Sequence, residues 1–124
     1  MSMIRGLRGA TTASSNTKLA IFEATKELLE SLVKENQIGV ESIASAIFTV
    51  TDDLNAAFPA TAARLGLGWQ DVGLMDLRQM TVPGDVPMCI RVLVLFNTDD
   101  ISNELKRVYL RGAKNLRDRN GESI

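Results

Sequence analysis

The most apolar stretch of the chain runs from Met88 to Phe96 and contains mainly Val, Leu and Ile. Proline and glycine residues precede it, and Thr98-Asp99-Asp100 follows it. This pattern predicts a central strand that is buried on both faces. Arg91 lies inside the stretch, and a guanidinium group keeps its charge even when it is buried. We therefore expect an anion to meet Arg91, which is either an internal carboxylate or a bound ligand.

Apolar periodicity predicts most of the other long elements. Three further strands are predicted, at residues 3–13, 43–51 and 69–80. The last of them is expected to be interrupted near Asp76, an acid among apolar neighbours. After the helix start signal Ser14–Thr17, apolar residues recur at helical spacing and predict a helix from Lys18 to about Asn36.

Two shorter helices are predicted from their start signals. Pro59, followed by small residues, indicates a short helix that places Ala60 and Arg64 on one face. The acidic and threonine residues after the central strand indicate a last helix over Ile101–Arg111. The polar residues 115–124 are expected to form a mobile tail.

The order of these elements predicts a single α+β domain over residues 1–124. We expect a mixed sheet of four to five strands with one long helix, one short helix and a C-terminal helix, packed mainly on one face. Because the central strand is apolar on both sides, the other face also needs cover. In a chain this short, self-association provides that cover most simply.

Composition removes several classes of function. The chain has 124 residues, a net charge of −1, no histidine and one cysteine. Without histidine, the commonest general base is missing and a zinc site is not expected. The small net charge argues against general attraction to nucleic acids or membranes. The single cysteine and the lack of a long apolar run fit a reducing cytoplasm, with neither a membrane span nor a secretion signal.

The candidate functional residues are arginines at positions where exposure to solvent alone does not explain a charged side chain. They are Arg8, Arg64, Arg91 and Arg117, to which the single tyrosine, Tyr109, can be added. Arginine with tyrosine, without histidine or a phosphate loop, suits the binding of a small molecule with several carboxylates. Taken alone, each arginine also fits a surface charge or a structural ion pair.

Several segments resemble the small monofunctional chorismate mutases of the α+β class, which are unrelated to the all-helical chorismate mutases. The resemblance runs in order over nearly the whole chain. It is carried by RGLRGATT at 5–12, DLNAAFPA at 53–60, GWQ at 68–70, CIRV at 89–92 and VYL at 108–110.

The resemblance implies a homotrimer that forms a pseudo-α/β barrel, with an active site at each subunit interface. It implies the conversion of chorismate to prephenate, a step towards phenylalanine and tyrosine. That reaction is an intramolecular Claisen rearrangement and needs no acid, base, nucleophile, metal or cofactor. A sequence without histidine is therefore compatible with it.

The resemblance also implies roles for individual residues. Arg91 would bind the ether oxygen and a carboxylate of the substrate, Arg8 would bind a carboxylate, and Tyr109 would donate a further hydrogen bond. The matching wall, rim and tail positions are Phe58, Ala60, Thr61, Arg64, Leu74, Met75, Leu116 and Arg117.

The chain departs from the family pattern at three positions of the expected site. Gln79 stands where the family usually has a glutamate that orients the arginine, and Asp76 stands where a cysteine is common. We hypothesise that Asp76 supplies the displaced carboxylate, which requires a bulge or strand end near residues 77–78 because residues three apart point to opposite faces. Thr61 replaces a family lysine, so one rim cation is missing.

Two other classes of function remain open at this point. The change to Gln79 favours a trimeric module that binds a small anionic metabolite without turnover. A small trimer of the enamine/imine deaminase type also uses an arginine at its subunit interface.

Overall fold

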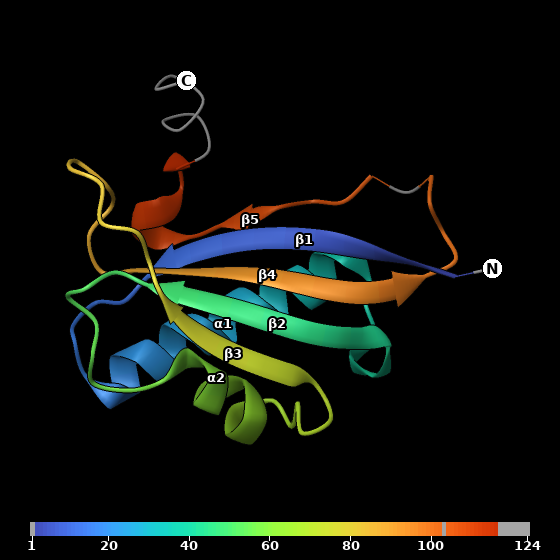
Figure 1. The fold of residues 1–124 in the computed structure, drawn as a ribbon, viewed down its shortest axis with the longest axis horizontal. Coiled ribbons are helices and arrows are strands. Elements are labelled where there is room, and N and C mark those ends of the chain that lie inside the picture. Colours follow the sequence, from blue (N-terminus) through green and yellow to red (C-terminus); the bar gives the residue numbers. More distant parts are fainter. Residues whose placement is uncertain (1, 103, 117–124) are drawn as a thin grey trace.

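The computed structural model describes residues 2–102 and 104–116 and contains a five-stranded mixed sheet (Figure 1). The strands are β1 Met3–Thr12, β2 Ile43–Val50, β3 Gly73–Arg78, β4 Cys89–Thr98 and β5 Val108–Tyr109. Their order across the sheet is β3-β2-β4-β1-β5. Strand β4 is antiparallel to β1 and β2, whereas the edge strands β3 and β5 run parallel to their neighbours. The prediction of an α+β fold with a central strand at Met88–Phe96 is confirmed.

Only one face of β4 is fully buried in the single chain. Ile90, Val92, Val94 and Phe96 point to the helix side and are at most 5% exposed. The residues between them, from Arg91 to Leu95, are half-buried. The opposite side of the sheet, called the open face below, lies away from α1, and among the described residues only a small core around Cys89 packs on it. Burial of β4 on both faces is therefore not reached within one chain.

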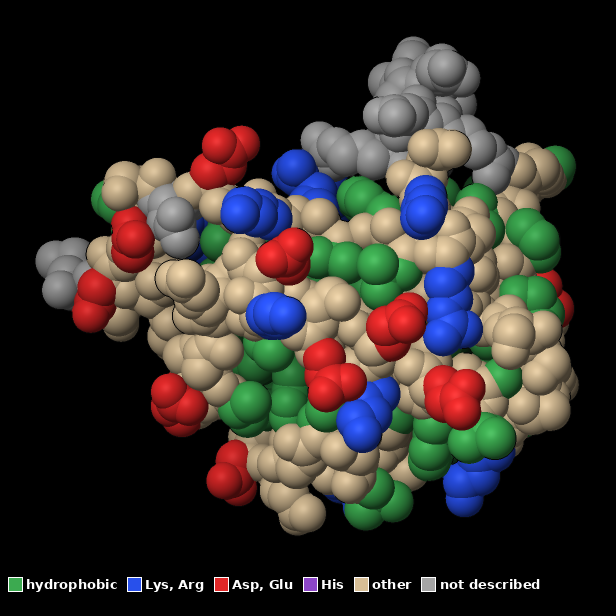
Figure 2. Space-filling model, turned by 180° about the vertical axis from the view of Figure 1, so that it is seen from behind, with side chains coloured by type: hydrophobic (Ala, Val, Ile, Leu, Met, Phe, Trp, Pro, Cys, Tyr) green, Lys and Arg blue, Asp and Glu red, His purple; other side chains and the backbone are tan. Residues whose placement is uncertain are grey.

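The long helix α1, Lys18–Asn36, lies behind the sheet and covers its buried face (Figure 1). Thr17 caps its start by accepting a hydrogen bond from the backbone N–H of Ala20, at 3.1 Å. Its inner residues, including Leu28, Leu29 and Leu32, are at most 1% exposed. The outer side of the molecule on this face carries interspersed acidic and basic side chains (Figure 2). The helix thus provides one side of the core, as its apolar spacing predicts.

Short helical segments lie on both sides of β2 in the chain order. A single turn, η1, covers Val40–Ser42 before β2, and α2, Pro59–Thr61, continues into a π-helical turn, η2, at Ala62–Gly66. The proline stands at the start of α2, as expected. Trp69 follows and is buried at 2% exposure. No described helix is long and apolar enough to cross a membrane.

The predicted helix over Ile101–Arg111 is wrong. Its described residues contain no α-helix, and Val108–Tyr109 instead forms β5 beside β1. Asn36, at the end of α1, binds the backbone of Lys106 twice, through its amide nitrogen at 2.9 Å and its oxygen at 2.7 Å. These contacts and the free edge of β1 hold the segment extended, which local sequence pattern does not reveal. A short 3-10 turn, η3, follows at Arg111–Ala113.

Strand β3 is also more regular than expected. Its pairing with β2 runs from Gly73 to Arg78 without a shift in register, so Asp76 causes no interruption. The backbone N–H of Gln79 still bonds to the carbonyl of Val50, at 2.9 Å, which extends the pairing by one residue.

Candidate active site

Residues from four strands form a row across the open face. Ala10 of β1 is in register with Arg91 of β4 and with Tyr109 of β5, and Arg91 is in register with Thr49 of β2. Side chains of paired residues point to the same face of a sheet. Tyr109, Arg91 and Thr49, called the cross-strand row below, therefore share the face that α1 leaves uncovered. Gln79 joins them, because its side-chain oxygen accepts a hydrogen bond from the Thr49 hydroxyl at 2.7 Å.

Arg8 lies on the same face, one step along the sheet. It pairs with Leu93, two residues after Arg91 in β4, and its side chain is exposed. Leu7, beside it in sequence, is buried at 1% exposure on the helix side. The alternation of β1 therefore directs Arg8 away from the core and towards the cross-strand row.

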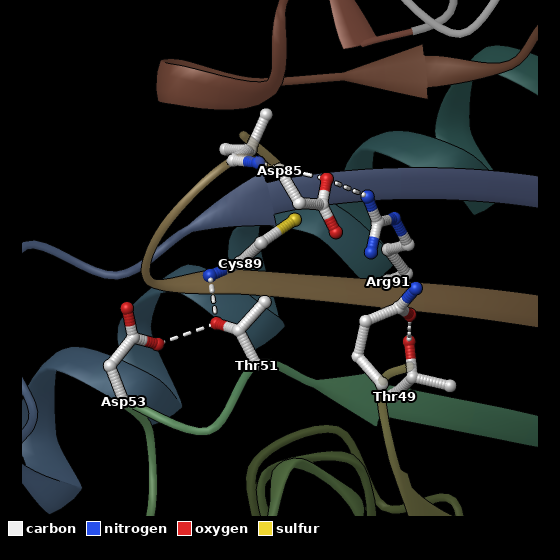
Figure 3. Close-up of polar contacts among 8 residues, drawn as sticks. Thr49, Thr51, Asp53, Asp85, Cys89 and Arg91 are labelled. Carbon is white, nitrogen blue, oxygen red and sulfur yellow. Dashed lines mark hydrogen bonds and ion pairs between the residues drawn. The ribbon is translucent and has the colours of Figure 1, made fainter. Parts of the chain in front are cut away.

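Arg91 forms an ion pair with Asp85 in the loop before β4 (Figure 3). The distance from Arg91 Nη2 to a carboxylate oxygen of Asp85 is 2.9 Å, and the two side chains are 20% and 18% exposed. The expectation that an anion meets Arg91 is therefore satisfied in part by an internal carboxylate. The second nitrogen of the fork, Arg91 Nη1, is buried and has no hydrogen-bond partner among the described residues. A buried donor without an acceptor is costly, so this atom is suited to a ligand oxygen.

Cys89 lies two residues before Arg91 and is buried at 1% exposure. Burial raises the pKa of its thiol to about 11, although the charge of Arg91 acts in the opposite direction. The backbone N–H of Cys89 donates to the Thr51 hydroxyl at 2.9 Å, and this hydroxyl in turn donates to the carboxylate of Asp53 (Figure 3). With so high a pKa the thiol stays protonated, so Cys89 fits a structural role better than that of a nucleophile.

Asp76 does not lie where the sequence hypothesis requires within one chain. It pairs with Phe48, which is fully buried on the helix side, whereas Gln79 is bound to Thr49 on the open face. The needed bulge is absent from the β2–β3 pairing. Instead, a carboxylate oxygen of Asp76 accepts a hydrogen bond from the backbone N–H of Ala60 at 3.0 Å, and partial burial raises the pKa of its carboxyl group. In its own chain, Asp76 therefore steadies the start of α2 and does not replace a charge at Gln79.

Several predicted wall residues gather around a separate cavity of about 590 Å³. Its lining includes Lys18, Phe22, Phe58, Thr61 and Asp76. Ala60 is linked to it through Asp76. Arg8, Arg91 and Tyr109 do not line this cavity. One chain therefore keeps the arginine-bearing residues and these wall residues apart.

The remaining predicted site residues are scattered over the molecule. Leu74 packs against the main core, Met75 is 55% exposed on the open face, and Arg64 is exposed on η2. Leu116 is buried at 4% exposure, in a small core that also contains Cys89 and against which Tyr109 packs. Arg117 lies outside the described residues.

Sequence reasoning missed two members of the site. Thr49 holds Gln79, and Asp85 holds Arg91. Strand alternation gives the face of Thr49, but its place beside Arg91 follows only once β2 is known to pair with β4. Asp85 follows Gly84 in an irregular loop, where no periodicity predicts the direction of a side chain.

These features define a class of protein: an α+β domain whose sheet carries Arg8, Arg91 and Tyr109 on the face opposite its long helix, an arrangement suited to an anionic ligand. Comparison with known proteins identifies the family. The sequence model of the family described as chorismate mutase type I matches residues 4–119. The chain belongs to this family.

Individual relatives agree with this assignment. The chain is 48% identical to chorismate mutase AroH of Thermus thermophilus over 116 residues, which cover 93% of this chain and 94% of that protein. It is 40% identical to chorismate mutase AroH of Bacillus subtilis (strain 168) over 115 residues, covering 93% and 91% of the two chains. The solved structure of a chorismate mutase from Clostridium thermocellum is similar, with a TM-score of 0.85 and 46% identity over 89% of this chain and 97% of that chain.

Proposed function

We propose that this chain, a chorismate mutase and hence an isomerase, rearranges chorismate to prephenate at a site built around Arg91. The observation that carries the proposal is the position of Arg91 on the open face, with Nη2 bound to Asp85 and Nη1 buried without an acceptor in the described part of the chain. Chorismate has two carboxylates and an ether oxygen that gains negative charge as its C–O bond breaks. A fixed guanidinium is suited to stabilise that charge.

Electrostatic stabilisation and conformer selection would together supply most of the required rate enhancement. The rearrangement moves no proton to or from the protein, so the lack of histidine is no obstacle. An enzyme at the low end of rate enhancement must lower its barrier by about 8 kcal/mol. One well-aimed donor can supply about 3–4 kcal/mol. Holding the substrate in its compact reactive conformer can supply much of the remainder.

We propose further that Arg8 binds a substrate carboxylate and that Tyr109 donates an additional hydrogen bond. The support is their common face with Arg91. Gln79 would contact the substrate as a neutral group from its position beside Thr49.

The site is proposed to be completed by a second chain in a homotrimeric barrel. The open face carries exposed apolar side chains, including Ile4 at 61%, Met75 at 55% and Leu77 at 47% exposure, which favours contact with another copy. In their own chain, the wall residues around the 590 Å³ cavity lie apart from Arg8, Arg91 and Tyr109. In this arrangement the cavity side of one chain faces the cross-strand row of the next. The wall and rim residues would be Phe58, Ala60, Thr61, Arg64, Asp76, Leu74, Met75, Leu116 and Arg117.

Because prephenate is a precursor of phenylalanine and tyrosine, we propose that the chain acts in aromatic amino acid biosynthesis. We also propose a cytoplasmic location and a reaction that uses no cofactor, metal or nucleic-acid partner. The lone cysteine is buried and unpaired, as suits a reducing compartment.

An absorbance assay for loss of chorismate, with prephenate identified as product, tests this function. Replacing the central cation in the variant Arg91→Ala should lower kcat/KM by about 10³-fold or more, because it removes the donor to the developing charge. Glu27, in an exposed ion pair with Arg111 at 3.1 Å, provides the control variant Glu27→Gln, which should retain activity. Full activity of Arg91→Ala, or binding of chorismate without turnover by the unaltered chain, would contradict the proposal.

A further inference from the structure

Gln79, which directly follows β3 and shares the open face with Arg91, carries no charge. Gln79 has its side-chain oxygen bound to Thr49, which is in register with Arg91. The acid that contacts the guanidinium comes from another part of the chain, the loop that leads into β4 (Figure 3). The ion pair of Asp85 with Arg91 therefore joins a loop residue to the centre of the sheet.

We propose that Asp85 is the positioning residue for Arg91: its carboxylate fixes the guanidinium through Nη2 and so directs Nη1 at the substrate. The proposal rests on the proposed function, since it concerns the same site. It assigns the orienting charge to Asp85 and not to Asp76, which lies on the helix side of the sheet.

Both partners of this ion pair are held in place independently. Arg91 stands in the middle strand, paired with β1 on one side and β2 on the other. Asp85 is fixed by its backbone N–H, which donates to the carbonyl of Val82 at 3.1 Å. Its carboxylate oxygen also accepts from the N–H of Val86, at 2.8 Å, and Val86 is buried in the small core beside Cys89. The contact is therefore preorganised and not a chance meeting of two long surface side chains.

The geometry favours positioning over competition with the substrate. An acid that blocked the site would occupy the donor that the substrate needs. The Asp85 oxygen lies 2.9 Å from Nη2, whereas Nη1 keeps no acceptor among the described residues. Because Arg donates from several nitrogens in a fixed fork, one arm can be anchored while another binds a ligand.

The test compares turnover by Asp85→Asn with that of the unaltered chain. Asparagine keeps the size and one acceptor of aspartate but removes the charge. We expect kcat/KM to fall about 10-fold to 100-fold, mainly through kcat, because a guanidinium displaced by about 1 Å loses its aim at the substrate. The melting temperature should change little. The control Glu27→Gln removes the charge of an exposed ion pair and should leave kcat/KM unchanged.

Restoring a carboxylate near Arg91 separates positioning from a merely structural role. Gln79 lies on the same face, so Gln79→Glu in the Asp85→Asn background should recover most of the lost kcat. Recovery of activity by this second change supports the proposal. A loss that Gln79→Glu does not restore, or a loss that follows a large drop in melting temperature, overturns it.

Two other outcomes also overturn the inference. Unchanged kcat/KM in Asp85→Asn means that Arg91 needs no anchor, and a lower KM means that Asp85 competes with the substrate. Neither result affects the proposed function, which depends on turnover by the unaltered chain and its loss in Arg91→Ala.

Discussion

The carboxyl group of Asp76 accepts a backbone hydrogen bond in this fold, a role that does not need its charge. Its oxygen accepts a hydrogen bond from Ala60 at the start of α2, and partial burial raises the pKa of the acid above its ordinary value of 3.8. A neutral residue with an acceptor oxygen would satisfy this hydrogen bond equally well.

The raised pKa of Asp76 predicts a pH-dependent stability for Asp76→Asn. The folded chain binds the proton of Asp76 more tightly than the unfolded chain does. The free energy of unfolding therefore falls as pH rises from about 3.8 through the raised pKa, and the ionised carboxylate lowers stability at neutral pH. The asparagine variant should melt at a higher temperature than the unaltered chain at pH 7. This difference should disappear below pH 3.8, where both side chains are neutral.

Thermal melts across this pH range, together with turnover at pH 7, check the prediction. A lower melting temperature for Asp76→Asn at neutral pH would contradict it. Turnover adds separate information, since activity near that of the unaltered chain would exclude Asp76 as a catalytic carboxylate in any subunit arrangement.

At the scale of single residues, the sequence predicts which face of the sheet several side chains occupy, but not which residues they contact. Strand alternation correctly predicts that Arg8 and Leu7 point to opposite faces, and that Asp76 and Gln79 do as well. It does not predict that Asp85 contacts Arg91, because a loop has no fixed period and the contact depends on Gly84 and on the packing of Val86.

At the scale of elements, the pairing of β5 with β1 determines the position of Tyr109 in the sheet. Gly9 of β1 is in register with Val108, one residue before Tyr109. A Cβ atom at Gly9 would lie 2.9 Å from the carbonyl oxygen of Val108 and 3.1 Å from both Leu28 and Leu32 of α1. The two strands can therefore approach only with glycine at this position.

Gly9→Ala is expected to destabilise the fold by about 1–3 kcal/mol, since neither the backbone of β5 nor the core can give way freely. Turnover should also fall, because β5 carries Tyr109. Urea unfolding and the chorismate assay measure the two effects. Gly6→Ala is the matched control in the same strand, as its Cβ would meet Leu93 and Leu95 at ordinary distances of 3.4 and 3.5 Å. Equal stability losses in the two variants would refute the steric argument.

Elements with a strong internal period are the ones that the sequence predicts well. The helix at Lys18–Asn36 and the strand at Cys89–Thr98 match their predictions closely because each repeats one pattern over many residues. The segment after the central strand has helix-like start residues, but Asn36 and the edge of β1 hold it extended. Contacts between residues 70 positions apart decided that outcome, and no local pattern contains them.

At the scale of the whole molecule, the open face is the feature that a single chain leaves unexplained. Ile47 lies half-buried near its middle, in register with Leu93 of β4 and Met75 of β3. The helix side of the sheet is covered by α1 (Figure 1), whereas on this side the described residues provide only the small core around Cys89.

Ile47→Lys should prevent self-association and abolish turnover, because a charge would be forced between packed sheets. Light scattering is expected to give the mass of three chains for the unaltered protein and of one chain for the variant. Leu19→Lys, at a position 69% exposed on α1, makes the same chemical change away from the open face and should retain both the mass and the activity. A trimeric and active Ile47→Lys variant would refute the proposed assembly.

The distance between the cross-strand row and the cavity has a genetic consequence. A copy that lacks the guanidinium of Arg91 still brings an intact cavity, and a copy whose cavity is blocked at Phe58 still brings an intact guanidinium. When two such defective copies are produced together, some junctions between them unite the two undamaged halves. Mixed particles should then regain part of the turnover that neither parent has, so two inactive alleles could support growth where each alone fails.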